Sequence, residues 1–288
     1  MATKKNQQRP VAIILADQPL DNELKTIFGE NGKSSLMIAG YSLIEHTLME
    51  LRDLGFEQVI ILAKHDATRI QKLIGNIQRW AMAINVMQLG LTAEQVLHQY
   101  KSLSNSHGLL VIEINSLRSH CIHSFLKQCK QSEYELLEAI IANQRSGITL
   151  LKPGSKNVII NPMPIELSNS KLTQLSNCHD FHQANFDVIA GQYTGIEPSV
   201  NRHSKTGYRQ HWSAFIHKKT QLKTNKLMVE RHCHIGQNTQ LDSVILNHDV
   251  FVDQLTSLKN TIVMPNSIIA KHNTICNAVV NNDTVYTI

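Results

Sequence analysis

The chain has 288 residues, a length that favours two domains, and its 42% hydrophobic and 18% charged content excludes a disordered protein. No apolar run approaches the roughly 18 residues of a membrane-spanning helix, and the first apolar segment is too short for a signal peptide. We therefore expect a cytoplasmic protein with no membrane segment. The net charge is +5, but the basic residues are scattered and only 5% of residues are aromatic, so no nucleic-acid partner is expected.

Cysteine and histidine offer no complete metal site. The five cysteines are widely spaced and include no CxxC pair, which favours reduced, mostly buried thiols over disulfides or a zinc ribbon. Three short segments, His120–His123, Cys178–His182 and His232–His234, each hold possible zinc ligands. None has a second ligand pair at finger spacing, so we interpret all three as histidine-rich sequence without a metal. His232 and His234 flank one residue and are expected to point outward together.

The first half of the chain alternates buried apolar runs with helical periodicity. Strands are expected at Val11–Ala16, Val59–Ala63, Ile84–Leu89 and Leu109–Ile112. Helices are expected between Ser42 and Gly55, from Asp66 to Ile74 and from Thr92 to Leu103. Such alternation predicts a doubly wound, Rossmann-like α/β fold around a mixed sheet. Ligands of such sheets bind at the carboxyl ends of the strands, which directs attention to the residue after each run.

The last quarter of the chain repeats every 17 residues. Three apolar columns and one turn column recur at this period: Ile245, Ile262 and Val279; Phe251, Ile268 and Val285; Leu258 and Ile275; and Asp249, Asn266 and Asp283. Within a block the apolar positions lie near six residues apart, which predicts a hexapeptide β-helix in which each strand buries its apolar residue against the coil below. A small antiparallel β-domain is the alternative, although it requires no columns in register.

Several segments resemble, in order, motifs of the sugar-phosphate nucleotidyltransferases, the NDP-sugar pyrophosphorylases that include mannose-1-phosphate guanylyltransferases. They are the opening VAIILA, the segment Gly32–Glu45 (GKSSLMIAGYSLIE), the segment Leu54–Leu62, and the repeat pieces Cys233–Gly236 and Thr261–Asn266. The stretch 130–212 shows no match. The resemblance implies a nucleotidyltransferase-like α/β domain over 1–210 and a left-handed parallel β-helix over 211–288. It also implies a role in supplying nucleotide sugars for surface polysaccharide or exopolysaccharide.

The family reaction that this resemblance implies is nucleotidyl transfer. A sugar 1-phosphate attacks the α-phosphate of an NTP and displaces pyrophosphate, with Mg²⁺ held by carboxylates. The family's first strand leads into a G-x-G-x-R loop, whereas this chain continues as DQPLDNEL. Gln18 and Leu20 stand where glycines are expected, and Pro19 has no N–H to donate. At an effective dielectric of ~20, one like charge at ~4 Å opposes phosphate binding by about 4 kcal/mol. Three carboxylates follow the strand: Asp17, Asp21 and Glu23.

Five residues remain as candidates for the site that the resemblance implies. Ala16, Asp17 and Lys33 are the candidate phosphate- or nucleotide-binding residues, and Lys33 aligns with a family lysine that contacts phosphate. Asn115 aligns with the metal-binding aspartate of the family. Glu113 shares a strand face with it, so the pair is the candidate site for Mg²⁺.

These observations leave three hypotheses for function. The first, which we favour, is a catalytically impaired relative that binds a nucleotide sugar, an NTP or a partner protein such as another enzyme, and forms a homo-oligomer through the β-helix. The second is an active sugar-1-phosphate nucleotidyltransferase in which Asp17 or Glu113 holds Mg²⁺ and Lys33 holds phosphate. The third is a β-helix acyltransferase with His248 or His272 as the base, for which the repeat is short.

Overall fold

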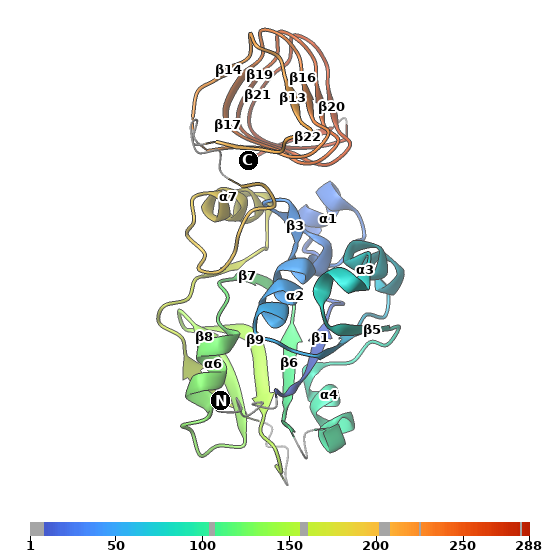
Figure 1. Ribbon diagram of the computed structural model, residues 1–288, viewed down its shortest axis with the longest axis vertical. Coiled ribbons are helices and arrows are strands. Elements are labelled where there is room, and N and C mark those ends of the chain that lie inside the picture. Colours follow the sequence, from blue (N-terminus) through green and yellow to red (C-terminus); the bar gives the residue numbers. More distant parts are fainter. Residues whose placement is uncertain (1–8, 104–106, 156–160, 202–207, 225, 283) are drawn as a thin grey trace, which may run out of the picture.

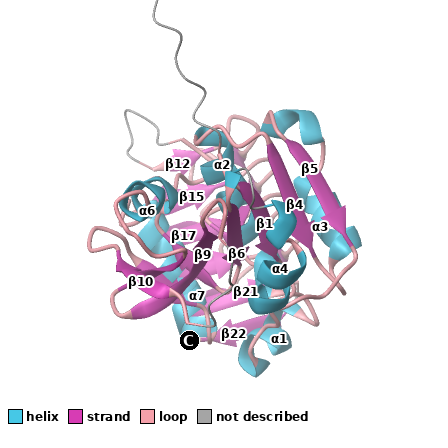
Figure 2. Ribbon diagram, turned by 90° about the horizontal axis from the view of Figure 1, so that it is seen from below, coloured by secondary structure: helices cyan, strands magenta, loops and turns pink. Residues whose placement is uncertain are grey.

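The apolar runs of the first half form the central strands of one mixed sheet (Figure 1). The computed structural model describes residues 9–103, 107–155, 161–201, 208–224, 226–282 and 284–288. From edge to edge, the strands of this sheet are β10 (Met163–Glu166), β8 (Leu136–Ile141), β9 (Gln144–Leu151), β6 (Leu109–Glu113), β1 (Val11–Leu15), β4 (Gln58–Leu62) and β5 (Ala83–Met87). β6, β1, β4 and β5 run parallel, and β9 is antiparallel to both of its neighbours (Figure 2). The expected α/β fold with a parallel-rich mixed sheet is thus present.

Helices connect these strands and cover both faces of the sheet. They are α1 (Asn22–Phe28), α2 (Leu43–Asp53), α3 (Ala67–Ile74), α4 (Ala93–Gln99), α6 (Ile122–Cys129) and α7 (Cys178–Ile189). The predicted start of α2 is confirmed, because Ser42 and Glu45 form a capping box. The helix expected up to Leu103 ends instead at Gln99, and a 3-10 turn, η3 (Lys101–Leu103), follows it. The serine in this turn competes for backbone hydrogen bonds and favours a turn over a continued helix.

Alternate residues of β1 face two separate cores. Ala12 and Ile14 are buried with the apolar faces of α1, α2, α3 and α6. Ile13 and Leu15 are buried on the opposite face with Val96 of α4. A strand that is buried on both faces reads as an uninterrupted apolar run, which is why this strand could be predicted from sequence. The remaining shorter elements are η1 (Lys33–Ser35), β2 (Met37–Ile38), β3 (Tyr41–Ser42), η2 (Ile77–Trp80), β7 (Ser116–Arg118) and β11 (Leu172–Gln174).

Most of the C-terminal strands stack in parallel, and Figure 1 shows them as nested turns of the chain above α7. One sheet contains β12 (Arg209–Gln210), β14 (Gln221–Leu222), β15 (Leu227–Val229), β17 (Gln240–Leu246), β19 (Ser257–Val263), β21 (Thr274–Asn281) and β22 (Thr284–Thr287). The other contains β13 (Phe215–Ile216), β16 (His234–Ile235), β18 (Phe251–Val252) and β20 (Ile268–Ile269). Ile245 pairs with Ile262 and Ile262 with Val279, which confirms that predicted column.

One additional turn of the stack lies before the predicted repeat. β12, β13 and β14 pair with the next turn at an offset of 19 residues, as in Phe215 with His234, whereas later turns are 17 apart. The two extra residues break the period, so a search at a fixed period of 17 does not find this turn.

The six-residue spacing assigned the wrong side chains to one buried column. Phe251 and Ile268 are 40% and 60% exposed, while the next residues, Val252 and Ile269, are buried. Both members of each pair are apolar, so spacing alone could not say which one faces inward. Phe251 pairs with Ile268, as the predicted period requires, but both side chains face outward.

The prediction that Val285 continues this column is also wrong. β22 folds back and pairs antiparallel with β21, so that Val285 lies opposite Val280 and does not continue the parallel stack. Asn281 pairs with Thr284 where the chain reverses, and Asn282 has φ 52°. Left-handed residues of this kind favour a tight hairpin.

Three further columns of the stack hold left-handed backbone conformations at its corners. Their members, each 17 residues apart, are His232, Asp249 and Asn266; Asn238, Leu255 and His272; and Ser243, Asn260 and Asn277. The predicted turn column is confirmed for Asp249 and Asn266, and its third member, Asp283, lies outside the described residues. Asparagine and aspartate tolerate this conformation better than other non-glycine residues, which explains their enrichment at the corners.

The C-terminal stack shares a hydrophobic core with the first half of the chain. Met228, Ile245, Ile262 and Val279 form a buried column on the outer side of the stack and belong to the same cluster as the apolar residues of α7. Their neighbours on the same strands face the interior of the stack and form a separate cluster. The column predicted from Ile245 therefore belongs to the core that the stack shares with the rest of the chain, and not to the interior of the stack. The proposed domain boundary at residue 210 stays a prediction.

A buried polar cluster supports α2 on the opposite side of this core. Nη1 of Arg118 donates to Oε2 of Glu50 at 2.6 Å, and the Ile122 N–H donates to the other oxygen of the same carboxylate at 2.6 Å. Nε2 of His46 lies 3.0 Å from the Ile38 carbonyl oxygen. Burial lowers the pKa of His46 to about 4 from its ordinary 6.5.

No helix in the described part of the chain has the length and apolar character to cross a membrane.

Acidification should destabilise the fold through His46. Between pH 6.5 and about 4, the unfolded chain binds a proton at this ring and the folded chain does not, so stability falls as the pH decreases through this window. His46→Gln keeps a donor for the Ile38 carbonyl and does not titrate. We expect the loss in unfolding free energy from pH 7 to pH 4.5, measured in urea, to be about 2 kcal/mol smaller in this variant. His123→Gln, at an exposed position on α6, is the control, and equal pH dependence of all three proteins would contradict the assignment.

The shared core makes a second prediction. Ile262→Ala removes a fully buried side chain from the column against α7 and should lower the unfolding free energy by about 3 kcal/mol. Ile268→Ala makes the same chemical change at an exposed position of the next strand and should cost no more than about 0.5 kcal/mol. Urea unfolding monitored by circular dichroism measures both. Similar costs for the two variants would show that the stack does not depend on its contact with α7.

Candidate functional site

The first candidate site lies at the carboxyl end of β1, where Ala16 and Asp17 follow the strand. The Asp17 carboxylate accepts hydrogen bonds from two consecutive backbone N–H groups after β4, those of Lys64 and His65, the second at 3.2 Å. Consecutive N–H groups at the end of a strand are the donors that bind phosphate in many nucleotide sites. Here a side chain of the protein occupies them.

The segment that leads into η1 covers the same strand end. The Gly32 N–H donates to Oδ2 of Asp66 at 2.7 Å, and the Lys33 N–H donates to the carbonyl of Gln18 at 2.8 Å. The Ser34 hydroxyl donates to the Ala16 carbonyl at 3.0 Å and is fully buried. A Cβ on Gly32 would lie 2.6 Å from the Asp66 carboxylate, so little space remains here. The backbone donors and the volume are both taken by the chain itself.

Lys33 lies beside this strand end but its ammonium group already has a partner. Nζ of Lys33 is 2.9 Å from Oδ2 of Asp21, and the lysine side chain is 13% exposed. A phosphate at Lys33 would have to displace this carboxylate. The structure therefore brings Ala16, Asp17 and Lys33 together as predicted, in an arrangement that satisfies its own charges.

Glu113 and Asn115, the candidate metal ligands, both lie against Gly147 of β9. Oδ1 of Asn115 accepts a hydrogen bond from the Ser116 hydroxyl at 3.0 Å. Burial raises the pKa of Glu113, and the charge of Arg145 partly offsets this effect. Arg145 also pairs with Glu138 at 3.2 Å. Glu113, Glu138 and Arg145 all line one pocket, which has a volume of about 200 Å³.

These residues do not fit Mg²⁺ well. A magnesium site needs several oxygen ligands in octahedral geometry, usually including carboxylates, and excludes nearby cations. Here a guanidinium stands beside the carboxylate, and the amide oxygen already accepts a hydrogen bond. Within the described ranges, no three His, Cys, Asp or Glu residues converge as metal ligands. His232 and His234 are both exposed, as predicted; His232 lies beside Asp249, and His234 stacks between the rings of Phe215 and Phe251.

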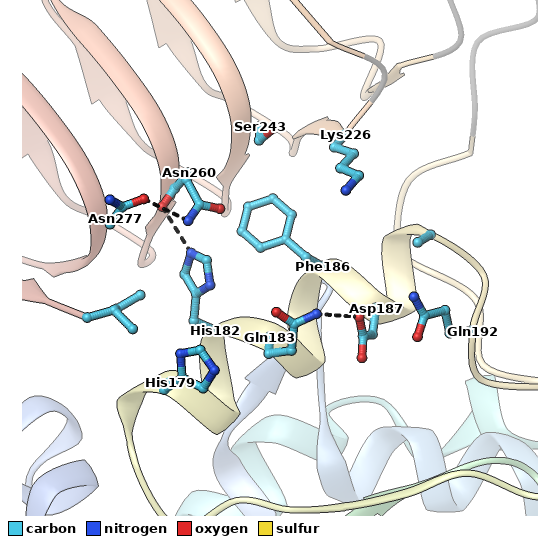
Figure 3. A pocket seen from close by; sticks show the side chains of 12 residues that line it. His179, His182, Gln183, Phe186, Asp187, Gln192, Lys226, Ser243, Asn260 and Asn277 are labelled. Carbon is cyan, nitrogen blue, oxygen red and sulfur yellow. Dashed lines mark hydrogen bonds between the residues drawn. The ribbon is translucent and has the colours of Figure 1, made fainter.

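Two larger pockets lie where the C-terminal stack meets the first half of the chain. The first, which we name the amide pocket, has a volume of about 350 Å³ and lies between α7 and one row of corners of the stack (Figure 3). In Figure 3, His182 points from α7 to the Asn260 carbonyl, at 3.0 Å, and Gln183 reaches Asp187, at 2.7 Å. The Asn260 amide in turn donates to Asn277 at 2.9 Å. Most polar groups of this pocket thus bind one another. Its lining residues are His179, His182, Gln183, Phe186, Asp187, Ala190, Gln192, Lys226, Ser243, Asn260, Asn277 and Ile288.

The second, which we name the charged pocket, has a volume of about 400 Å³ and lies at the other ends of the same stacked strands. It is lined by Met37, Gly40, Tyr41, Glu45, Lys72, Leu73, Gly75, Arg79, Ser199, Val200, His211, Glu230, Arg231 and His248. The β2–β3 hairpin, α2, α3 and η2 supply one wall, and the ends of β15 and β17 supply the other. Both halves of the chain are therefore needed to form it.

Two buried carboxylates belong to the charged pocket. Glu45 pairs with Arg79 at 2.7 Å, and Glu230 accepts a hydrogen bond from the Ser199 hydroxyl. Burial raises the pKa of Glu230, although the Ser199 hydrogen bond and the nearby charge of Arg231 oppose this effect. Burial also raises the pKa of Tyr41, and the two carboxylates add to the rise. The phenol therefore keeps its proton and can donate a hydrogen bond near neutral pH.

Gly40 allows the two walls of the charged pocket to approach. Its φ is 89°, and a Cβ there would lie 1.9 Å from the Ser199 hydroxyl and 2.1 Å from the Glu230 carboxylate. A side chain at this position would separate the hairpin from the stack. Gly40 belongs to the segment that resembles the nucleotidyltransferases, but that resemblance gave no indication of this contact.

Sequence reasoning did not identify the charged pocket. Glu45 was noted only as part of a family-like segment, and His248 only as a possible base in an acyltransferase. Glu230 and Arg231 gave no signal at all, because the repeat pattern reports which strand residues are apolar and not what lies opposite a corner.

Comparison with known proteins adds no family. No protein-family model matches the chain, and no curated protein is significantly similar to it. The nucleotidyltransferase resemblance thus stays a prediction, and function has to be argued from the geometry above.

The occupied strand end makes a prediction about stability. Asp66→Ala leaves the Gly32 N–H without its acceptor and should lower the unfolding free energy by about 1.5 kcal/mol, the range for a charged hydrogen-bond acceptor. Asp66 precedes α3 but makes no capping hydrogen bond, so the loss reports the Gly32 contact. Asp53→Ala removes an exposed carboxylate paired with its neighbour Arg52 and should cost less than about 0.5 kcal/mol. Urea unfolding that shows equal costs would contradict the proposed contact.

Proposed function

We propose that this chain is a catalytically impaired relative of the sugar-phosphate nucleotidyltransferases that acts in the cytoplasm by binding a nucleotide sugar. The observation that carries the proposal is the filled strand end after β1. The N–H groups of Lys64 and His65 bind Asp17, and that of Gly32 binds Asp66. Nucleotidyl transfer needs such donors on the phosphates together with a bound metal ion.

A triphosphate would meet several costs at this strand end. It would have to displace the carboxylates of Asp17 and Asp66 from their donors, and Asp21 from Lys33. Each displaced carboxylate would remain nearby as a like charge, which at ~4 Å and a dielectric of ~20 opposes binding by about 4 kcal/mol. Glu113 and Asn115 supply no metal site that would offset this repulsion. The alternative of an active enzyme with a variant loop therefore has less support.

The proposal includes a left-handed parallel β-helix for the C-terminal stack. Supporting features are the 17-residue register of the parallel strands and the three columns of left-handed corner residues. The outward row of Phe215, His234, Phe251 and Ile268 gives this helix an apolar face that suits the predicted homo-oligomer. A pathway role in polysaccharide precursor supply follows only from the family resemblance.

Two assays on the purified full-length chain test this function. Isothermal titration with UDP-glucose, GDP-mannose and the four NTPs, each with and without Mg²⁺, should show binding of at least one nucleotide sugar that does not require the metal. Incubation of each NTP with glucose 1-phosphate or mannose 1-phosphate should release no pyrophosphate above the rate without protein. Turnover with any pair would overturn the impaired-enzyme proposal. Absence of binding to every nucleotide sugar would overturn the binding role and favour a protein partner.

A further inference from the structure

We propose that the buried polar cluster beside α2 is a binding site for a single water molecule, held by Nδ1 of His46, Nη2 of Arg118 and Nε2 of His120. The site lies between α2 and the end of β7, and its lining residues include none of those that line the amide pocket or the charged pocket. It is independent of the proposed function, because it requires no nucleotide sugar.

These three nitrogen atoms are buried without a hydrogen-bond partner. None of them is bonded to any residue that the structure describes. His46 is 4% exposed and Arg118 is 8% exposed, so bulk solvent does not reach these side chains freely. Buried polar atoms in folded proteins are nearly always paired, either with the protein or with ordered water. Three such atoms in neighbouring residues therefore point to a shared ligand.

The three residues line one small pocket. Its volume is about 10 Å³, which is enough for one water molecule and too little for an organic ligand. The pocket is lined by Leu43, His46, Thr47, Glu50, Ser116, Leu117, Arg118 and His120.

The geometry of α2 brings the three side chains close to one another. His46 and Glu50 are four residues apart on this helix and are therefore neighbours on one face. Nη1 of Arg118 donates to Oε2 of Glu50 at 2.6 Å, which holds the whole guanidinium, including Nη2, against this face. Burial lowers the pKa of His120, and the charges of Glu50 and Arg118 also act on it, so this ring lies near the same ion pair.

Water supplies both kinds of hydrogen bond that the site requires. Nε2 of His46 lies 3.0 Å from the Ile38 carbonyl, which can only accept, so this nitrogen carries the hydrogen. Burial lowers the pKa of His46 to about 4, and the ring is therefore neutral near pH 7, with Nδ1 as an acceptor. Nη2 of Arg118 can only donate. A water molecule can donate to the first and accept from the second, and it satisfies His120 in either tautomer.

Ions suit this site less well than water does. A metal cation would lie beside the guanidinium of Arg118, which repels it. An anion would face the lone pair of His46 Nδ1 and the carboxylate of Glu50. A neutral molecule that both donates and accepts avoids both conflicts.

A high-resolution crystal structure of the full-length chain, grown at pH 7 with sodium bromide and zinc chloride, tests the site. We expect one density peak at about 3 Å from each of the three nitrogens, with no anomalous signal at the bromine or the zinc absorption edge. An anomalous signal at this peak would show an ion and overturn the proposal. Direct pairing of the three nitrogens with protein groups, without a peak between them, would also overturn it.

Nuclear magnetic resonance of the ¹⁵N-labelled chain gives a second test in solution. At pH 7 the His46 ring should carry its hydrogen on Nε2 and show a cross-peak to a water molecule that exchanges slowly with the solvent. His123, exposed on α6, is the control and should show only rapidly exchanging water. A hydrogen on Nδ1 of His46, or the same rapid exchange at both histidines, would contradict a bound water.

Discussion

The burial of one apolar column of the C-terminal stack in the core of the α/β part joins the two parts of the molecule. Met228, Ile245, Ile262 and Val279 are apolar although they do not belong to the interior cluster of the stack, because they are buried in the core shared with α7 and other elements of the α/β part. This contact joins two sheets of different construction into one core. It also places one end of the stacked strands at the amide pocket and the other end at the charged pocket. Both pockets are lined by residues of the stack and of the α/β part.

Charge balance differs between the end of β1 and the charged pocket. At the strand end, Lys33 is paired with Asp21, and the backbone N–H groups of His65 and Gly32 donate to Asp17 and Asp66. The charged pocket is lined by three cations, Lys72, Arg79 and Arg231, of which Arg79 pairs with Glu45 and Arg231 lies near Glu230. A site that has satisfied its own charges gains little from an anionic ligand, since binding must first break existing interactions. The strand end is therefore the less favourable of the two places for an anionic ligand.

The sequence was informative where burial decides the residue type. β1 and β4 are buried on both faces, so their apolar runs are continuous, and the pairing of Ile245 with Ile262 follows from a strict period. The sequence was less informative where a strand residue could be buried either inside the stack or against the rest of the chain. The Ile245 column is buried in a core shared with α7 and other elements, and α7 lies in the stretch 130–212 that matched no motif. Long-range polar contacts could not be predicted, because the bond from Gly32 to Asp66 joins residues 34 apart with no shared pattern.

Absence of glycine after β1 predicted the loss of a phosphate loop but not what replaced it. In the structure, carboxylates take the place that phosphate oxygens would hold on the backbone donors. This substitution keeps the donors satisfied without a ligand, and an unsatisfied N–H group at a strand end would otherwise cost stability. A fold that depends on a bound nucleotide to satisfy these groups would be stabilised by its substrate. In this protein, carboxylates of the chain satisfy the N–H groups without a nucleotide. Under the proposed relationship, the fold therefore no longer depends on the substrate of the family reaction.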